Sequence, residues 1–165
     1  MQQAAPEPLA AGLEGGARRL LRVAVAALSR RDHSRAELRR KLIDRLQPEE
    51  GEQDVTQALD RLQHRGLLCD RRMAEALVRV RSSRYGRQRI AQELDRRGVD
   101  RDTIAAVLPP PEDENAAALD LWRRKFGQAP ASLQERARQS RFLAARGFSS
   151  AVIRRVLAGS DDVDC

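Results

Sequence analysis

The sequence predicts an all-α protein made of three tandem three-helix modules, arranged in an elongated, curved array. Apolar residues recur at helical spacing along the chain, and the alternating Val, Ile, Thr and Tyr runs that favour strands are absent. Apolar residues make up 41% of the 165 residues and aromatic residues only 3%. We therefore expect Leu, Ala, Val and Ile to fill the core, and an internal repeat defines the modules.

The first module is predicted over residues 17–66. Its first helix spans about 17–30, where leucines and alanines form one apolar face. Ser34 and Glu37 have the spacing of a capping box, in which each side chain satisfies an open amide at the start of the second helix. The third helix is expected to end at Gly66.

The second module is predicted over residues 67–108. Asp70 is placed to act as the N-cap of its first helix. A short amphipathic helix then ends at Gly98, because glycine alone adopts the left-handed conformation there without a β-carbon clash. The module closes with a helix over 101–108.

The third module is predicted over residues 110–158. The proline run 109–111 ends the preceding helix and suits the first turn of the next one. That next helix contains Trp122, which we expect in the core. Helices over 132–146 and 150–158 complete the module.

Both ends of the chain are expected to lack fixed structure. Residues 1–16 are rich in Pro and Gly and carry no basic segment, so they read as a disordered tail and not as a signal peptide. Residues 159–165 are predicted to be a frayed acidic tail.

The internal repeat supports the tandem arrangement. A shift of 49 residues brings the second module onto the third, and a terminating glycine is among the matches. One module of about 45 residues is near the lower limit for independent folding, so stacking would help to bury each open face. The matched pairs are Leu94 and Leu143, Arg97 and Arg146, Gly98 and Gly147, Val99 and Phe148, Ile104 and Ile153, Val107 and Val156, and Leu108 and Leu157.

The charge follows the same rhythm. Net charge is +7, from 31 basic and 24 acidic residues, and nearly all of the basic residues are arginine. Basic blocks over 18–48, 71–97 and 123–155 alternate with acidic segments. If the three modules stack in register, the basic blocks would form one basic stripe, which favours an anionic partner. Solvated helix faces, or an arginine excess set by genomic base composition, remain alternatives for each block.

The residue patterns of common catalytic and metal sites are absent from the sequence. There is no Cys-x-x-Cys, His-Glu-x-x-His, Gly-x-Ser-x-Gly or phosphate-binding glycine loop. His33 is expected at a surface or between helices, and Glu37 and Glu93 in caps or salt bridges. We therefore predict a non-enzyme without cofactor or metal. The two cysteines form no disulfide framework, and no apolar run spans a bilayer, so a cytoplasmic protein is expected.

Three stretches, in order, resemble the signatures of the RecX family. The first is residues 31–42, Arg-Asp-His-Ser-Arg-Ala-Glu-Leu-Arg-Arg-Lys-Leu. The second is Gly66-Leu67-Leu68-Cys69-Asp70-Arg71-Arg72-Met73-Ala74, continuing through Tyr85-Gly86 and Glu93-Leu94 to Gly98-Val99. The third is Arg146-Gly147-Phe148 with Ile153 and Val156-Leu157. Together they cover about residues 19–158.

The resemblance implies a regulator of RecA, the bacterial recombinase. Proteins of this family lie in the groove of the RecA–DNA filament and suppress strand exchange, ATP hydrolysis and coprotease activity, and so affect DNA repair, recombination and the SOS response. The implied partners are the RecA filament and single- or double-stranded DNA, contacted through arginine and phosphate. We expect a monomer without membrane association.

The predicted RecA- or DNA-binding residues lie on the basic stripe. They are Arg79, Arg81, Arg84, Tyr85, Arg87 and Arg89 in the middle module, Arg35, Arg39 and Arg40 in the first, and Arg136, Arg138 and Arg141 in the third. Arg87, Arg89 and Arg96 lie off the apolar stripe of their helix and are expected to be solvated. One alternative is a stand-alone helical DNA-binding regulator that places a helix in the major groove. Another is a nuclease, which would require clustered carboxylates or histidines that the sequence lacks.

Overall fold

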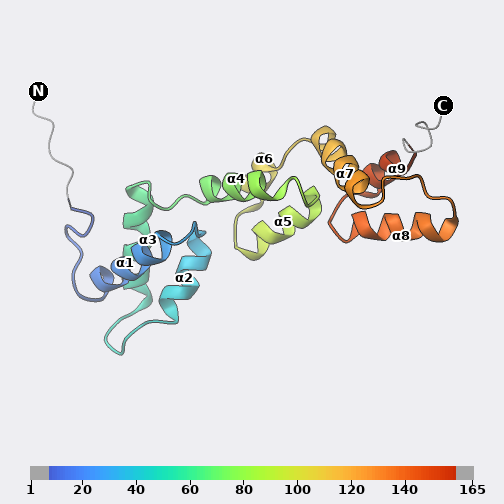
Figure 1. Ribbon diagram of the computed structural model, residues 1–165. Coiled ribbons are helices and arrows are strands. Elements are labelled where there is room, and N and C mark those ends of the chain that lie inside the picture. Colours follow the sequence, from blue (N-terminus) through green and yellow to red (C-terminus); the bar gives the residue numbers. More distant parts are fainter. Residues whose placement is uncertain (1–7, 159–165) are drawn as a thin grey trace, which may run out of the picture. The chain divides into compact units, whose positions relative to one another are not determined.

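The computed structural model describes residues 8–158, and within them every regular element is an α-helix (Figure 1). The all-α prediction is therefore confirmed, while the elongated, curved arrangement stays a prediction. None of these helices combines the length and the apolar character needed to cross a bilayer. The helices are α1 (Gly15–Leu28), α2 (Arg35–Ile43), α3 (Glu52–His64), α4 (Asp70–Arg81), α5 (Arg87–Arg96), α6 (Arg101–Val107), α7 (Pro111–Lys125), α8 (Leu133–Ala144) and α9 (Ser150–Ala158).

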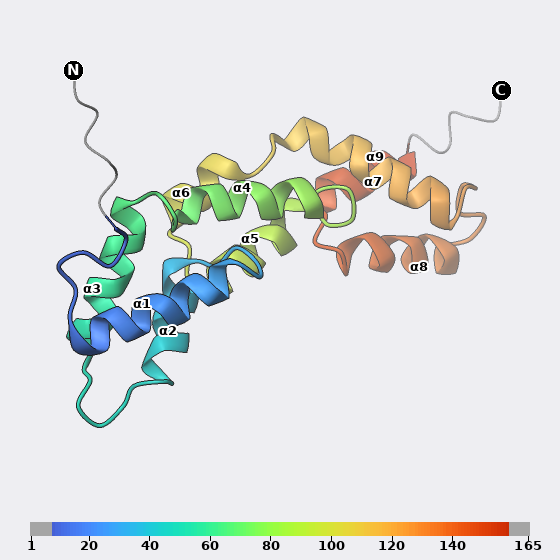
Figure 2. The same cartoon turned by 60° about the vertical axis from the view of Figure 1, so that its left-hand side comes forward.

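The chain divides into two compact units. The first consists of the described part of residues 1–73 together with 97–99. In it, α1 packs against α3, and α2 packs against both (Figure 2). Leucine, alanine and valine side chains from these helices form the core, as the composition predicts. The largest fully buried ones are Leu20, Leu38, Leu42, Leu59, Leu62 and Val55.

The second unit consists of residues 74–96 and the described part of 100–165. Its core lies between α7, α8 and α9, which group together in both views (Figures 1 and 2). Trp122 is buried there, as predicted, and its indole Nε1–H donates to Gln139 Oε1 at 2.7 Å. This bond satisfies the polar end of a large buried side chain, which would otherwise cost stability.

The predicted disordered tail is wrong for residues 8–16. Leu13 is only 6% exposed and belongs to the core of the first unit, with Leu9 packed against it. Two arginines hold this segment by its backbone: Arg61 donates to the Leu9 carbonyl at 3.1 Å and Arg18 to the Leu13 carbonyl at 3.0 Å. These contacts, and the burial of Leu13 in the core, outweigh the Pro and Gly content on which the prediction rested. Residues 1–7 and 159–165 of the predicted tails lie outside the described residues.

The start of α2 has the predicted capping box. Ser34 Oγ accepts from the Glu37 amide at 3.0 Å, and a Glu37 carboxylate oxygen accepts from the Ser34 amide at 3.0 Å. The Ser34 hydroxyl also donates to the carbonyl of Arg97. The cap of one helix therefore also satisfies an open carbonyl from a distant segment of the same unit.

The second unit repeats this junction 49 to 52 positions later in the sequence. The Gly86 amide, just before α5, donates to the carbonyl of Arg146 at 2.9 Å. Gly98 and Gly147, which follow the two accepting arginines, have φ of +77° and +80°. In each case a left-handed glycine lies against the start of an earlier helix, so the repeat found in the sequence marks a repeated contact.

A carboxylate completes each junction. Asp70 Oδ1 accepts from the backbone amide of Arg35 at 2.7 Å, and Glu114 Oε1 accepts from that of Arg87 at 2.9 Å. The prediction that Asp70 is the N-cap of its own helix is therefore wrong. Asp70 is the first residue of α4. Its carboxylate instead lies at the positive N-terminal end of α2, where it accepts from a backbone amide that would otherwise have no acceptor.

One ion pair ties α1 to the loop between α2 and α3. Arg19 donates to both carboxylate oxygens of Glu50, and the contact from its Nε to Oε1 is 2.6 Å. The Gln47 amide donates to Glu50 Oε2 at 2.9 Å. The Glu50 side chain is only 7% exposed. These donors, the Arg19 guanidinium first, lower the pKa of Glu50 from 4.5 to about 2, against the opposing effect of burial.

Gly147→Ala should destabilise the protein by about 2–4 kcal/mol, because a β-carbon there meets the backbone nitrogen of Arg89 at 2.5 Å in a left-handed backbone. Gly66→Ala is the matched control. Gly66 also has positive φ, of +67°, but nothing lies within 4 Å of an added β-carbon. Its cost should be about 1 kcal/mol. If urea unfolding showed the same loss of unfolding free energy for both variants, the close contact of Gly147 with Arg89 would not be what makes Gly147 necessary.

Glu50→Gln should lower stability at neutral pH and reduce its acid sensitivity. Because the folded-state pKa of Glu50 is depressed to about 2, the pair stabilises the fold above pH 4.5 and loses this effect as pH falls through about 2. The difference in unfolding free energy between wild type and Glu50→Gln should therefore shrink across this window. Glu49→Gln, at the exposed neighbouring position, is the control and should change the unfolding free energy only slightly at neutral pH.

Candidate functional site

The predicted binding residues divide into two groups by exposure. The half-buried ones are Arg35, Arg81, Tyr85 and Arg87. The exposed ones are Arg39, Arg40, Arg79, Arg84, Arg89, Arg136, Arg138 and Arg141. The contacts of each group decide which guanidinium groups remain available to an external anion.

The arginines of α2 are largely neutralised by α3. Arg35 pairs with Asp60, with Nη2 and Oδ1 2.7 Å apart, and also donates to Gln63. Arg39 forms an ion pair with Glu52. Arg40, the third predicted residue of α2, also has an interaction partner within the chain. The basic block of the first module therefore presents less free charge than its sequence indicates.

Arg87 departs most clearly from the prediction of a solvated side chain. It is half-buried, its guanidinium donates to the carbonyl of Pro109, and its amide is bound to Glu114. Glu114 itself is only 6% exposed. Helical spacing placed Arg87 off the apolar stripe of α5, but the segment before α7 covers it. Arg87 is thus a structural contact within the second unit.

Tyr85 and two arginines form a stack beside α5. The guanidinium carbon of Arg89 lies 4.7 Å from the Tyr85 ring centroid, and that of Arg81 lies 5.7 Å from it. Arg89 also donates to the carbonyl of Ala145 at 2.8 Å. Arg81 forms an ion pair with Glu93, which confirms the predicted salt-bridge role of that carboxylate. This arrangement fixes the positions of two cationic groups that remain partly accessible.

The arginines of α8 are the most open. Every residue from 131 to 138 is exposed, and Arg141 follows on the same helix. Arg138 lies over the Phe126 ring at 5.4 Å. Within the described part of the chain, the side chains of Arg136 and Arg141 have no hydrogen-bond or ion-pair partner, and the same holds for Arg79 and Arg84. These four guanidinium groups are available to an external anion.

Sequence reasoning missed a groove beside this stack. It has a volume of about 430 Å³, and α5 forms one wall while the turn after α8 forms the other. Arg96 lines it, although the predicted set omitted this residue. The signal was present in the sequence: Arg81, Arg89 and Arg96 share the basic block over 71–97, but only the fold brings alanine and glycine backbone opposite them.

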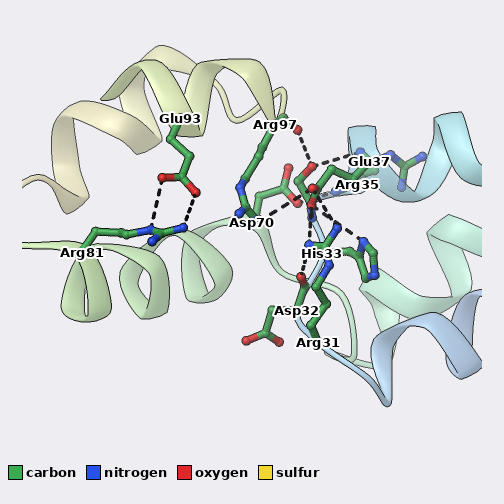
Figure 3. Close-up of polar contacts among 10 residues, drawn as sticks. Arg31, Asp32, His33, Arg35, Glu37, Asp70, Arg81, Glu93 and Arg97 are labelled. Carbon is green, nitrogen blue, oxygen red and sulfur yellow. Dashed lines mark hydrogen bonds and ion pairs between the residues drawn. The ribbon is translucent and has the colours of Figure 1, made fainter. Parts of the chain in front are cut away.

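His33 is buried at 5% exposure, which confirms a position between helices (Figure 3). Its Nδ1 lies 3.8 Å from a Glu37 oxygen. Burial first, and then the charge of Arg31, lower the pKa of His33, and Glu37 opposes this shift. Glu37 also pairs with Arg31 at 3.2 Å and Arg97 at 3.8 Å. In the described chain, no group of three or more His, Cys, Asp or Glu side chains could hold a metal ion.

Arg87→Gln should lower the unfolding free energy by about 1–2 kcal/mol, because it removes a charge-assisted hydrogen bond to the Pro109 carbonyl. Arg84→Gln, three residues earlier and exposed, should change stability by less than about 0.5 kcal/mol. Chemical denaturation of the two variants provides the measurement. A stable Arg87→Gln protein would return Arg87 to the set of candidate binding residues.

Comparison with known proteins identifies the family. Family models described as the second and third three-helix domains of RecX match residues 70–108 and 112–157. "Regulatory protein RecX" of Pseudomonas entomophila is 47% identical, covering 87% of this chain and 92% of that protein. "Regulatory protein RecX" of Chromobacterium violaceum is 44% identical, covering 86% and 90%.

Solved structures agree on the fold. The crystal structure of RecX from Lactobacillus salivarius superposes with a TM-score of 0.77 at 18% identity, covering 90% of this chain and 98% of that one. A second, titled as the crystal structure of regulatory protein RecX, has a TM-score of 0.70 at 22% identity, covering 86% and 71%. The module bounds 17–66, 67–108 and 110–158 stay predictions. Because more than four fifths of this chain aligns with these RecX relatives at 44–47% identity, the chain belongs to the RecX family.

Proposed function

We propose that this chain is a regulator that binds in the groove of the RecA–DNA filament and inhibits its recombinase, ATPase and coprotease activities. It would thereby modulate DNA repair and the SOS response, as a cytoplasmic monomer without enzymatic activity of its own. Membership of the RecX family supports the regulatory role, since the relatives carry the name regulatory protein. The sequence resemblance supplies RecA as the partner.

The observation that carries this proposal is the set of four arginines without a partner in the described chain. Arg79 and Arg84 lie at α4 and just after it, and Arg136 and Arg141 lie on α8. A guanidinium group binds phosphate and carboxylate through two parallel hydrogen bonds. Several such groups on one chain can contact neighbouring subunits and nearby phosphates of a filament at once, so weak contacts add through effective concentration.

The contacts also rank the predicted residues. Arg35 and Arg39 already hold carboxylates, so binding an external anion would require them to exchange partners. Arg87 holds the fold together. We therefore assign the filament-binding role first to Arg79, Arg84, Arg136 and Arg141, with Arg40, Arg81, Tyr85, Arg89 and Arg138 in support. Arg35 and Arg39 contribute less.

The experiment is a RecA strand-exchange assay with the full chain carrying Arg79→Glu, Arg84→Glu, Arg136→Glu and Arg141→Glu. Half-inhibition should require at least roughly tenfold more of this variant than of wild type, because four exposed charges that favour an anionic partner are reversed. ATP hydrolysis by RecA should recover in parallel. Circular dichroism should remain unchanged, since these side chains make no hydrogen bond or ion pair within the described residues.

A control for charge reversal elsewhere is Arg22→Glu with Arg30→Glu, which reverses half as many charges, on exposed arginines of the first unit outside the predicted set. This variant should inhibit like wild type. Full inhibition by the folded quadruple variant would refute the assigned residues. Sequence-specific duplex binding by the chain without RecA would instead favour a stand-alone DNA-binding regulator.

A further inference from the structure

The groove beside α5 is open, polar and lined mostly by positive charge. Its volume is about 430 Å³, and all of its lining residues belong to the second unit. The α5 wall carries long polar side chains, while the opposite wall is formed by small residues at the end of α8. The lining consists of Arg81, Gln88, Arg89, Gln92, Glu93, Arg96, Ala144, Ala145 and Gly147.

The close approach of the two walls is maintained by backbone hydrogen bonds. The Gln88 amide donates to the Gly147 carbonyl at 3.3 Å, and Arg89 donates to the Ala145 carbonyl at 2.8 Å. Because alanine and glycine form the far wall, no side chain from it fills the groove. The space therefore faces three arginines and leaves room for a group that the chain itself does not supply.

Among the described residues that line the groove, Glu93 is the only acidic one. Its carboxylate lies against the Arg81 guanidinium, with Nε to Oε2 and Nη2 to Oε1 both 3.3 Å apart (Figure 3). Two nearly parallel contacts of this kind are also how a guanidinium holds two oxygens of a phosphate. The pair is not deeply buried, since the Arg81 and Glu93 side chains are 39% and 28% exposed.

We propose that this groove binds a phosphodiester group of a nucleic-acid strand, and that the Glu93 carboxylate occupies the place on Arg81 that the phosphate takes. Arg89 and Arg96 supply the further positive charge, and Gln88 and Gln92 supply neutral donors. The Glu93 carboxylate competes with an incoming phosphate for Arg81. This competition weakens the binding of an isolated phosphate, whereas a strand that makes several contacts at once can still bind. The inference deepens the proposed function by naming a nucleic-acid contact, but its test needs no RecA.

A partly exposed ion pair is readily exchanged. Surface pairs contribute little to stability because solvent and salt screen them, so an incoming anion loses little by displacing Glu93. Arg89 is already oriented by the Ala145 carbonyl and the Tyr85 ring, which reduces the ordering that binding requires. Three positive groups against one negative group leave the groove cationic even before Glu93 moves.

The test measures binding of a fluorescent 20-residue oligo-dT to the full-length chain by anisotropy at low salt. Oligo-dT presents phosphodiesters without base-specific contacts. Glu93→Gln should bind roughly fivefold more tightly than wild type, because a negative charge next to the site is removed. Asp95→Asn is the matched control: it makes the same charge change on an exposed residue of α5 that does not line the groove. It should change affinity by less than about twofold.

A second pair of variants separates competition from net charge. Arg81→Gln should weaken binding, and Glu93→Gln added to it should tighten binding less than it does in the wild-type chain, because no Arg81 guanidinium is left for the carboxylate to release. Net charge alone predicts the same tightening in both backgrounds. Arg96→Gln should lower the salt slope of log K by about 0.7, the value for one lost phosphate contact on a single strand. Thermal unfolding should remain close to wild type for all of these surface variants.

Equal tightening by Glu93→Gln and Asp95→Asn would overturn the proposal, because it would reduce the effect to overall charge. So would groove variants that alter binding to poly-glutamate but leave oligo-dT binding unchanged, since the site would then serve an acidic protein. A duplex of the same length distinguishes the source of the phosphodiester, and either strand form supports the site. If these results hold while the strand-exchange variants still inhibit RecA, only the assigned filament-binding residues fail.

Discussion

The contact between a left-handed glycine and the start of an earlier helix is the constraint on which both units depend. Gly98 approaches Ala36 so closely that an added β-carbon would collide with it, and Gly147 approaches Arg89 in the same way. The backbone carbonyl of the residue before each glycine accepts a hydrogen bond from a residue just before the earlier helix. Arg97 accepts from the Ser34 hydroxyl, and Arg146 accepts from the Gly86 amide. A helix end and a helix start thus satisfy each other's open backbone groups, and this repeats along the chain.

This junction also determines which arginines remain available. It brings the turn after α8 against α5, so Arg89 donates to the Ala145 carbonyl and the groove acquires a wall of small residues. On the adjoining side, Glu114 takes the first amide of α5 and the Pro109 carbonyl takes the guanidinium of Arg87. Neighbouring residues on one short helix therefore have opposite roles: Arg87 stabilises the fold, and Arg89 faces solvent.

Local rules account for what the sequence predicted correctly. The capping box of Ser34 and Glu37 and the stop at Gly98 follow from spacing and backbone conformation alone, and both are present. The errors involve partners far away in sequence. Asp70 caps α2 and not α4, and Leu13 is buried by helices that follow it. The groove likewise requires residues 144–147 opposite α5, a pairing that no periodicity encodes.

The same distinction explains why charge counts misjudge a basic surface. The block over 18–48 and the block over 123–155 have similar arginine contents, yet α3 supplies Asp60 and Glu52 to the first. In the third block, Glu135 is the one carboxylate, and its Oε2 accepts from the Ala131 amide at 2.9 Å at the start of α8. The arginines on α8 thus keep their charge exposed. A basic surface is effective where the fold uses the nearby carboxylates for caps, and it is weakened where the fold pairs them with the arginines themselves.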